Sequence, residues 1–147
     1  MIDILISHLP ILIVICPLMM SLIVVLISNN YLSWLITLVT TFITFVISLL
    51  LYQEVQIHSL ISYALGNWAP PLGIEYVIDH VSIIPLIIIS GIGFLATLFA
   101  FKVMPSEIDK DTISKTYSLW LLAIAGLLGL VTTGDAFNLF VFLEISS

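Results

Sequence analysis

The chain has 147 residues, of which 61% are hydrophobic and only 8% are charged. Soluble domains contain about 25% charged residues, so this composition indicates an integral membrane protein. The formal net charge is -6, with three lysines and no arginine, which excludes a basic surface for nucleic acid. A single cysteine, Cys16, allows neither an internal disulfide nor a cysteine-based metal cluster.

Long apolar runs predict membrane-spanning helices, because crossing a hydrocarbon core of about 30 Å takes about 20 apolar residues. Four runs occupy residues 4–27, 31–52, 81–103 and 116–133, and a fifth begins at residue 136. Residues 53–80 have mixed polarity and several turn residues, so we expect them to lie at the membrane surface. The sequence therefore predicts an all-α integral membrane bundle of four transmembrane helices plus a truncated fifth.

The positions of the lysines predict the orientation of the chain in the membrane. Lys102, Lys110 and Lys115 flank or occupy the polar loop 104–115. Positive charge near span ends favours the cytoplasmic side, so we expect this loop in the cytoplasm and the amino terminus outside. The start of the chain has no basic residue, so we expect the first run to remain in the mature protein of the cell membrane.

Small residues predict close packing between helices. Ala125 and Gly129 are four residues apart, which places them on one face of the fourth predicted span. Such pairs let the backbones of membrane helices approach closely. We therefore expect a packed bundle rather than independent spans.

An acidic residue stands at the start of the fifth predicted helix. Asp135 follows Gly134 in a turn and can cap the helix through its carboxylate, which also suits the positive end of the helix dipole. A role in ion access is the alternative for Asp135. Capping is the favoured interpretation, and both roles stay open.

A second acidic residue lies within the fifth predicted helix. Glu144 is nine residues beyond Asp135, which places it about 13–14 Å into the membrane core. A carboxylate there costs several kcal/mol unless it is protonated or paired, and such residues mark proton or ion routes. Phe137, Phe140 and Val141 share its helical face. The alternative is a Glu144 held protonated for packing alone.

No pattern in the chain predicts catalysis, a cofactor or a metal site. His8, His58 and His80 lack metal-ligand spacing to a second histidine or cysteine. The sequence contains no phosphate-binding glycine loop, nucleophile elbow or dinucleotide fingerprint. We therefore expect a transport-type protein without a bound cofactor.

Two segments resemble a known family of membrane proteins. They are LVTTGDAFNLFVFLEISS at residues 130–147 and GNWAPPLGIEYVID at residues 66–79. Both are similar to the proton-translocating antiporter-like subunits of multisubunit cation/proton antiporters, respiratory complex I and membrane-bound hydrogenases. The second segment is most similar to the D-type subunit of the antiporters.

The resemblance implies roles for two residues and a set of partners. Glu144 matches the family's fifth-helix glutamate, which is implied to take up and release protons under control of a lysine on a later helix. Asp135 matches the acidic residue at that helix start. The implied partners are other subunits of a multisubunit complex, beside the lipid bilayer that the composition predicts. A separately encoded C-terminal part is a further partner if the chain is one half of a split subunit, and a truncated reading frame or a partial sequence is the alternative.

The resemblance predicts a fragment of a cation/proton antiporter subunit of the D type. Residues 136–147 would extend only about 18 Å as a helix, too short for the membrane core, which also indicates a fragment. One alternative is an antiporter-like proton-pumping subunit of a complex I or hydrogenase-type redox complex, with electron carriers in partner subunits. Another is a non-transporting truncated remnant.

Overall fold

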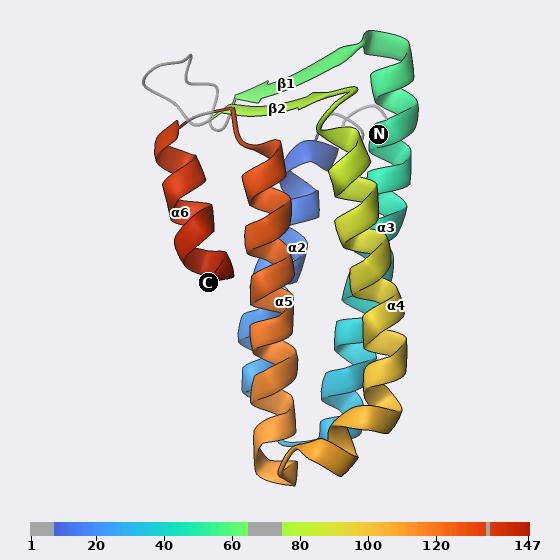
Figure 1. Ribbon diagram of the computed structural model, residues 1–147, viewed down its shortest axis with the longest axis vertical. Helices are drawn as coiled ribbons and strands as arrows, with labels where there is room; N and C mark the ends of the chain where they lie inside the picture. Colours follow the sequence, from blue (N-terminus) through green and yellow to red (C-terminus); the bar gives the residue numbers. More distant parts are fainter. Residues whose placement is uncertain (1–7, 65–74, 135) are drawn as a thin grey trace.

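A bundle of helices and a small two-stranded sheet make up the computed structural model, which describes residues 8–64, 75–134 and 136–147 (Figure 1). The sheet lies across one end of the bundle, and the α2–α3 and α4–α5 turns lie at the other. In chain order the elements are α2 (Leu9–Val25), α3 (Asn30–His58), β1 (Leu60–Ala64), β2 (Glu75–Asp79), α4 (Ile83–Glu107), α5 (Lys110–Thr132) and α6 (Ala136–Ser146).

Three of the described helices, α3, α4 and α5, are long and apolar enough to cross a membrane. Helix α2 is also apolar but has 17 residues, and α6 has 11. The bundle is therefore a mostly helical membrane architecture. The number of spans and their limits stay predictions.

The ends of α3 follow from local hydrogen bonding. The Asn29 side chain accepts hydrogen bonds from the backbone N–H groups of Tyr31, at 3.0 Å, and Leu32, at 3.3 Å. These two groups have no partner inside the helix, so the asparagine stabilises its start. At the other end Ser59 has a φ of 63°, which stops the helix and turns the chain into β1.

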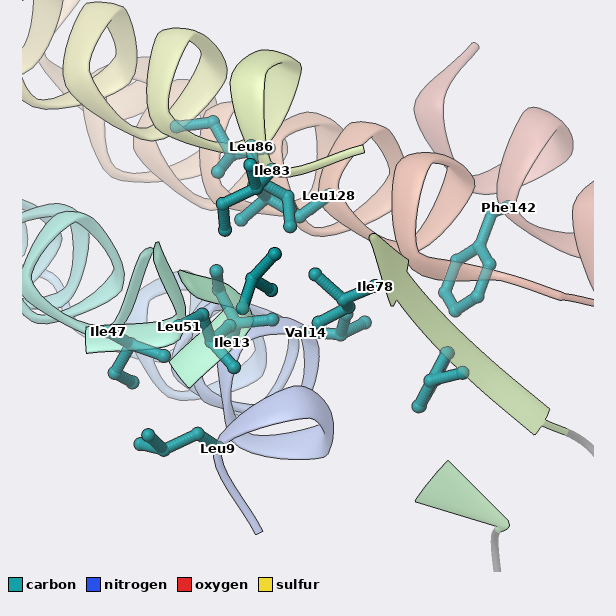
Figure 2. Packing of buried hydrophobic residues seen from close by; sticks show 13 residues of the cluster. Leu9, Ile13, Val14, Ile47, Leu51, Ile78, Ile83, Leu86, Leu128 and Phe142 are labelled. Carbon is teal, nitrogen blue, oxygen red and sulfur yellow. The ribbon is translucent and has the colours of Figure 1, made fainter. Parts of the chain in front are cut away.

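The apolar core lies below the sheet, where side chains from five helices and β2 meet (Figure 2). Ile13, Ile78 and Leu128 come from α2, β2 and α5, and none of them has exposed surface. Strand β2 therefore closes the end of the bundle with apolar side chains. Its antiparallel partner β1 pairs with it from Leu60 opposite Asp79 to Ala64 opposite Glu75.

A stripe of buried hydroxyl groups runs along the inner face of α3. Its members are at most 3% exposed: Ser33, Thr37, Thr40, Thr41, Thr44 and Ser48. Each donates to a backbone carbonyl of the preceding turn of the helix. Two of them also reach other helices, because Ser48 lies 2.9 Å from Ser90 of α4 and Ser33 lies 3.0 Å from Ser114 of α5. Such hydroxyl contacts hold helices together in lipid, where apolar packing alone gives little preference.

The structure differs from the sequence-based expectations in two places. Residues 60–64 and 75–79 form a sheet, whereas the sequence predicted an all-α fold. The side chains of β2 alternate between buried and half-buried, but this pattern is a weak signal in a segment rich in turn residues. The expected loop 104–115 is mostly helical, and only residues 108 and 109 separate α4 from α5. The apolar runs of the sequence end where the polar residues begin. Helices α4 and α5 nevertheless continue into these polar residues, because the backbone hydrogen bonds of a helix do not depend on lipid.

Candidate functional site

The junction between α5 and α6 is built against the edge of the sheet. Thr133 forms an isolated bridge with Tyr76, and the Gly134 N–H donates to the Glu75 carbonyl oxygen at 2.8 Å. A Cβ atom on Gly134 would lie 2.6 Å from the Val77 Cγ2 atom. Only glycine fits this approach, so the sequence at the junction lets β2 hold the start of α6.

Two glycines of α5 allow α6 to pack closely. A Cβ atom on Gly129 would lie 2.3 Å from the Phe142 ring, and one on Gly126 would lie 2.7 Å from the Ser146 nitrogen. The sequence pointed to Ala125 with Gly129. The structure keeps Gly129 at the contact and adds Gly126, while Ala125 is fully buried. Close packing through small residues therefore fixes the inner face of α6.

That inner face carries a buried polar side chain. Asn138 is 5% exposed, and among the described residues its Nδ2 atom has no hydrogen-bond partner. The Asn138 side chain does act on the nearby Tyr76 phenol. Burial raises the pKa of Tyr76, and the Asn138 side chain opposes part of that rise. A polar pair thus links the sheet to α6.

Glu144 lies on the opposite face of α6, which nothing in the described chain covers. Its side chain is exposed, as are those of Phe140 (67%), Val141 (40%) and Leu143 (43%). Among the described residues its carboxylate has no ion pair or hydrogen bond. The expected apolar neighbours Phe140 and Val141 do share its face. Asp135 and the side chain of Phe137 lie outside the part of the chain that the structure describes.

A second acidic residue organises the surface end of α4. Asp79 Oδ1 accepts hydrogen bonds from the backbone N–H of Ser82, at 2.8 Å, and of Val81, at 3.1 Å. The Ser82 backbone and hydroxyl hold the pKa of Asp79 below its ordinary value. The Asp79 carboxylate therefore stabilises the turn between β2 and α4.

Sequence reasoning missed Tyr76 and Asn138. Both lie in the segments that carry the family resemblance, and the structure places residues 75 and 76 of the first segment beside residues 133 and 134 of the second. A tyrosine inside an alternating run, and an asparagine inside an apolar helix, were the signals that could have found them.

These features define the class of protein: a helical membrane subunit in which one helix presents a carboxylate on an uncovered face. No protein-family model matches the chain. Curated proteins do match it, and the chain is a relative of the proton-translocating antiporter-like membrane subunits.

Three relatives illustrate the match. The chain is 44% identical to the N-type subunit of the NADH-quinone oxidoreductase of Desulforudis audaxviator, over 58% of the chain and 17% of the relative. It is 35% identical to the D-type subunit of the Na(+)/H(+) antiporter of Alkalihalophilus pseudofirmus, over 67% of the chain and 20% of the relative. It is 34% identical to the mnhD2 antiporter subunit of Staphylococcus aureus, over 95% of the chain and 28% of the relative. The chain thus spans less than a third of each.

Two solved structures share the fold. The Mrp complex from Dietzia sp. matches with a TM-score of 0.84 and 26% identity, over 97% of this chain and 26% of that one. The membrane-bound sulfane sulfur reductase, an archaeal respiratory membrane complex, matches with a TM-score of 0.82 and 30% identity, over 95% of this chain and 28% of that one. The resemblance predicted from the sequence is confirmed, and the protein is antiporter-like.

Proposed function

We propose that the protein takes part in cation/proton antiport as a subunit of the D type, and that Glu144 carries the proton. One observation supports this most strongly: among the described residues Glu144 has no ion pair, and it lies on the face of α6 that no described element covers. In lipid such a carboxylate is stable only when it is protonated or meets water or a cation. A group that changes between these states can bind and release a proton.

The inner face of α6 supports the same role. Gly126, Gly129 and Gly134 fix the helix against α5 and β2, so the outward direction of Glu144 is set by backbone packing. A proton carrier needs such a fixed position, because proton transfer requires hydrogen-bond reach. Asp135, at the start of the same helix, is proposed as its cap or as a group for ion access.

The membrane arrangement belongs to this proposal. Residues 4–27, 31–52, 81–103 and 116–133 and the helix from residue 136 are the proposed spans, with residues 53–80 at the surface. The loop 104–115 is placed in the cytoplasm and the amino terminus outside, because all three lysines lie around that loop. Other subunits of a multisubunit complex are the proposed partners, and any redox chemistry belongs to them.

The test is proton flux through native membranes that carry the Glu144→Gln variant. Glutamine keeps the size of the side chain and cannot release a proton. We expect cation-driven proton efflux from everted vesicles to be lost, with an unchanged amount of protein in the membrane. The matched control is Glu107→Gln, an exposed glutamate at the opposite end of the bundle, which should leave the flux intact. Unchanged flux in Glu144→Gln would remove the proposed role.

The likeness to the N-type subunit of NADH-quinone oxidoreductase supports a second candidate, a proton-pumping subunit of a redox complex. The antiporter relatives and the Mrp structure favour the first. Purification from native membranes discriminates between them. Small antiporter subunits in the purified complex would support antiport, and iron–sulfur or quinone-binding subunits would support the redox complex. A protein that accumulates stably without any partner would support a non-transporting remnant.

A further inference from the structure

A polar hollow lies at the end of the bundle away from the sheet. It occupies about 220 Å³ between the α2–α3 turn and the start of α5. Its polar lining includes Asn30, Lys110, Asp111, Ser114 and Lys115. A single water needs only about 10–15 Å³ of such space, so a much larger polar group fits.

Hydrogen bonds between the two turns fix the walls of the hollow. The Asn30 side-chain amide donates to the Lys110 carbonyl oxygen at 2.9 Å. The buried Ser114 hydroxyl lies 2.7 Å from the Val24 carbonyl oxygen and 2.6 Å from that of Ile27, and it donates to one of them at a time. The hollow is therefore a built feature of the bundle and does not depend on a mobile side chain for its shape.

The charges in the hollow favour an anion. Lys110 and Lys115 both line it, and among the described residues neither ammonium group has an ion pair or a hydrogen bond. Asp111 lines it as well but lies beyond ion-pair distance from both lysines, so two positive charges face one negative charge. Lys110 and Asp111 also begin α5, and their backbone N–H groups have no partner inside the helix, whereas that of Thr112 donates to the Asp109 carbonyl oxygen at 2.8 Å.

The position of the hollow indicates where the anion comes from. Helices α3 and α5, which border it, are both long and apolar enough to span a membrane, and if both do so their ends at the hollow reach the lipid headgroups. Basic pockets between such helices bind anionic headgroups, whose phosphate accepts hydrogen bonds from ammonium and backbone N–H groups.

We propose that this hollow binds a phosphate group, carried by an anionic lipid headgroup, between Lys110, Lys115 and the start of α5. Bound there, the headgroup ties the α2–α3 turn to α5. The site is separate from Glu144, which lies on α6 near the far end of the chain, and it does not depend on the proposed proton transfer.

The test compares lysines at the same end of the bundle. The protein is purified from native membranes with the subunits it retains, reconstituted in phosphatidylcholine vesicles containing phosphatidylglycerol, and extracted again for mass spectrometry of bound lipid. The double variant Lys110→Gln/Lys115→Gln should retain phosphatidylglycerol about 25-fold less well, at roughly fivefold per lysine. The matched control is Lys102→Gln, because Lys102 is an exposed lysine that does not line the hollow.

A second arm distinguishes the source of the phosphate. Inorganic phosphate is added to the protein in detergent, and the midpoint of thermal unfolding is recorded. If the ligand is a lipid headgroup, inorganic phosphate should leave the unfolding midpoint unchanged. Phosphatidylglycerol should raise the midpoint of the unchanged protein but not that of the double variant. A rise with inorganic phosphate that the double variant loses would support the site with free phosphate as its ligand. Equal lipid retention in the double variant and Lys102→Gln, without any response to phosphate, would overturn the proposal.

Discussion

Helices α3 and α6 both carry polar side chains in apolar surroundings, but the hydroxyl stripe of α3 is satisfied within the described chain, whereas two polar groups of α6 have no described partner. The α3 hydroxyls donate to backbone carbonyls, and Ser48 and Ser33 also contact hydroxyls of neighbouring helices. On α6, the Asn138 Nδ2 atom is buried without a partner and the Glu144 carboxylate stands on an uncovered face. The difference agrees with a structural role for the polar groups of α3 and with the proposed proton-carrying role of Glu144 on α6.

The largest effect on stability is expected where α6 packs on α5. In Gly129→Ala the new Cβ atom would lie 2.3 Å from the Phe142 ring, so the ring must move out of the core. We expect a loss of about 1–3 kcal/mol in stability, measured by thermal unfolding in detergent. The control is Gly91→Ala, whose Cβ atom would approach the Phe45 ring only to 3.3 Å. Equal unfolding midpoints for the two variants would break the account of α6 packing.

A smaller effect, dependent on pH, is expected at the contact between the sheet and α6. Burial raises the pKa of Tyr76 in the folded protein above its ordinary value of 10.0. The resulting stability is complete below pH 10 and is lost as the pH rises through the folded pKa, because ionisation then becomes easier in the unfolded chain.

The Tyr76→Phe variant isolates this contribution. Between about pH 9 and pH 11, its midpoint of thermal unfolding should fall less than the midpoint of the unchanged protein. Phenylalanine keeps the ring contact with Phe142, whose centroid lies 6.3 Å away. The same alkaline decline in both proteins would assign the effect to other tyrosines.

The smallest effects on stability are expected for single polar groups of α3 and α6. Ser48→Ala removes a hydroxyl that contacts Ser90 and should cost about 0.6 kcal/mol, the typical value for such contacts between membrane helices. The double variant Tyr76→Phe/Asn138→Leu removes the amide together with the phenol hydroxyl that it contacts, so stability should be unchanged or higher. Thermal unfolding of both variants is the measurement. A larger loss in the double variant than in Ser48→Ala would mean that Asn138 is satisfied by a bound water or another group.

Much of the fold follows from the sequence because lipid imposes simple rules. Apolar runs located the helices, and Ala125 with Gly129 pointed to a close contact, although the structure uses Gly126 with Gly129. The sheet escaped prediction because Tyr76 and Ile78 are buried by contacts with α6 and the core that come from distant parts of the chain. Short strands give a weak local signal, and their pairing depends on tertiary structure.

The candidate site was predictable in part. Glu144 can be predicted as a functional residue from the sequence alone, because a carboxylate in lipid is costly; its role stays a prediction. The pairing of Tyr76 with Thr133 and the surroundings of Asn138 Nδ2 could not be derived, because they depend on how β2 meets the α5–α6 junction. The lysine-lined hollow was equally hidden, since it forms only when two turns distant in sequence come together.

The deciding measurement compares proton flux in Glu144→Gln and Ser48→Ala in the same native membranes. One variant changes the carboxylate of α6, which has no ion pair among the described residues, and the other changes a satisfied hydroxyl of α3. The account predicts that cation-driven proton flux is lost in Glu144→Gln and retained in Ser48→Ala, with equal amounts of both proteins in the membrane. Retained flux in Glu144→Gln, or equal loss in both variants, would contradict it.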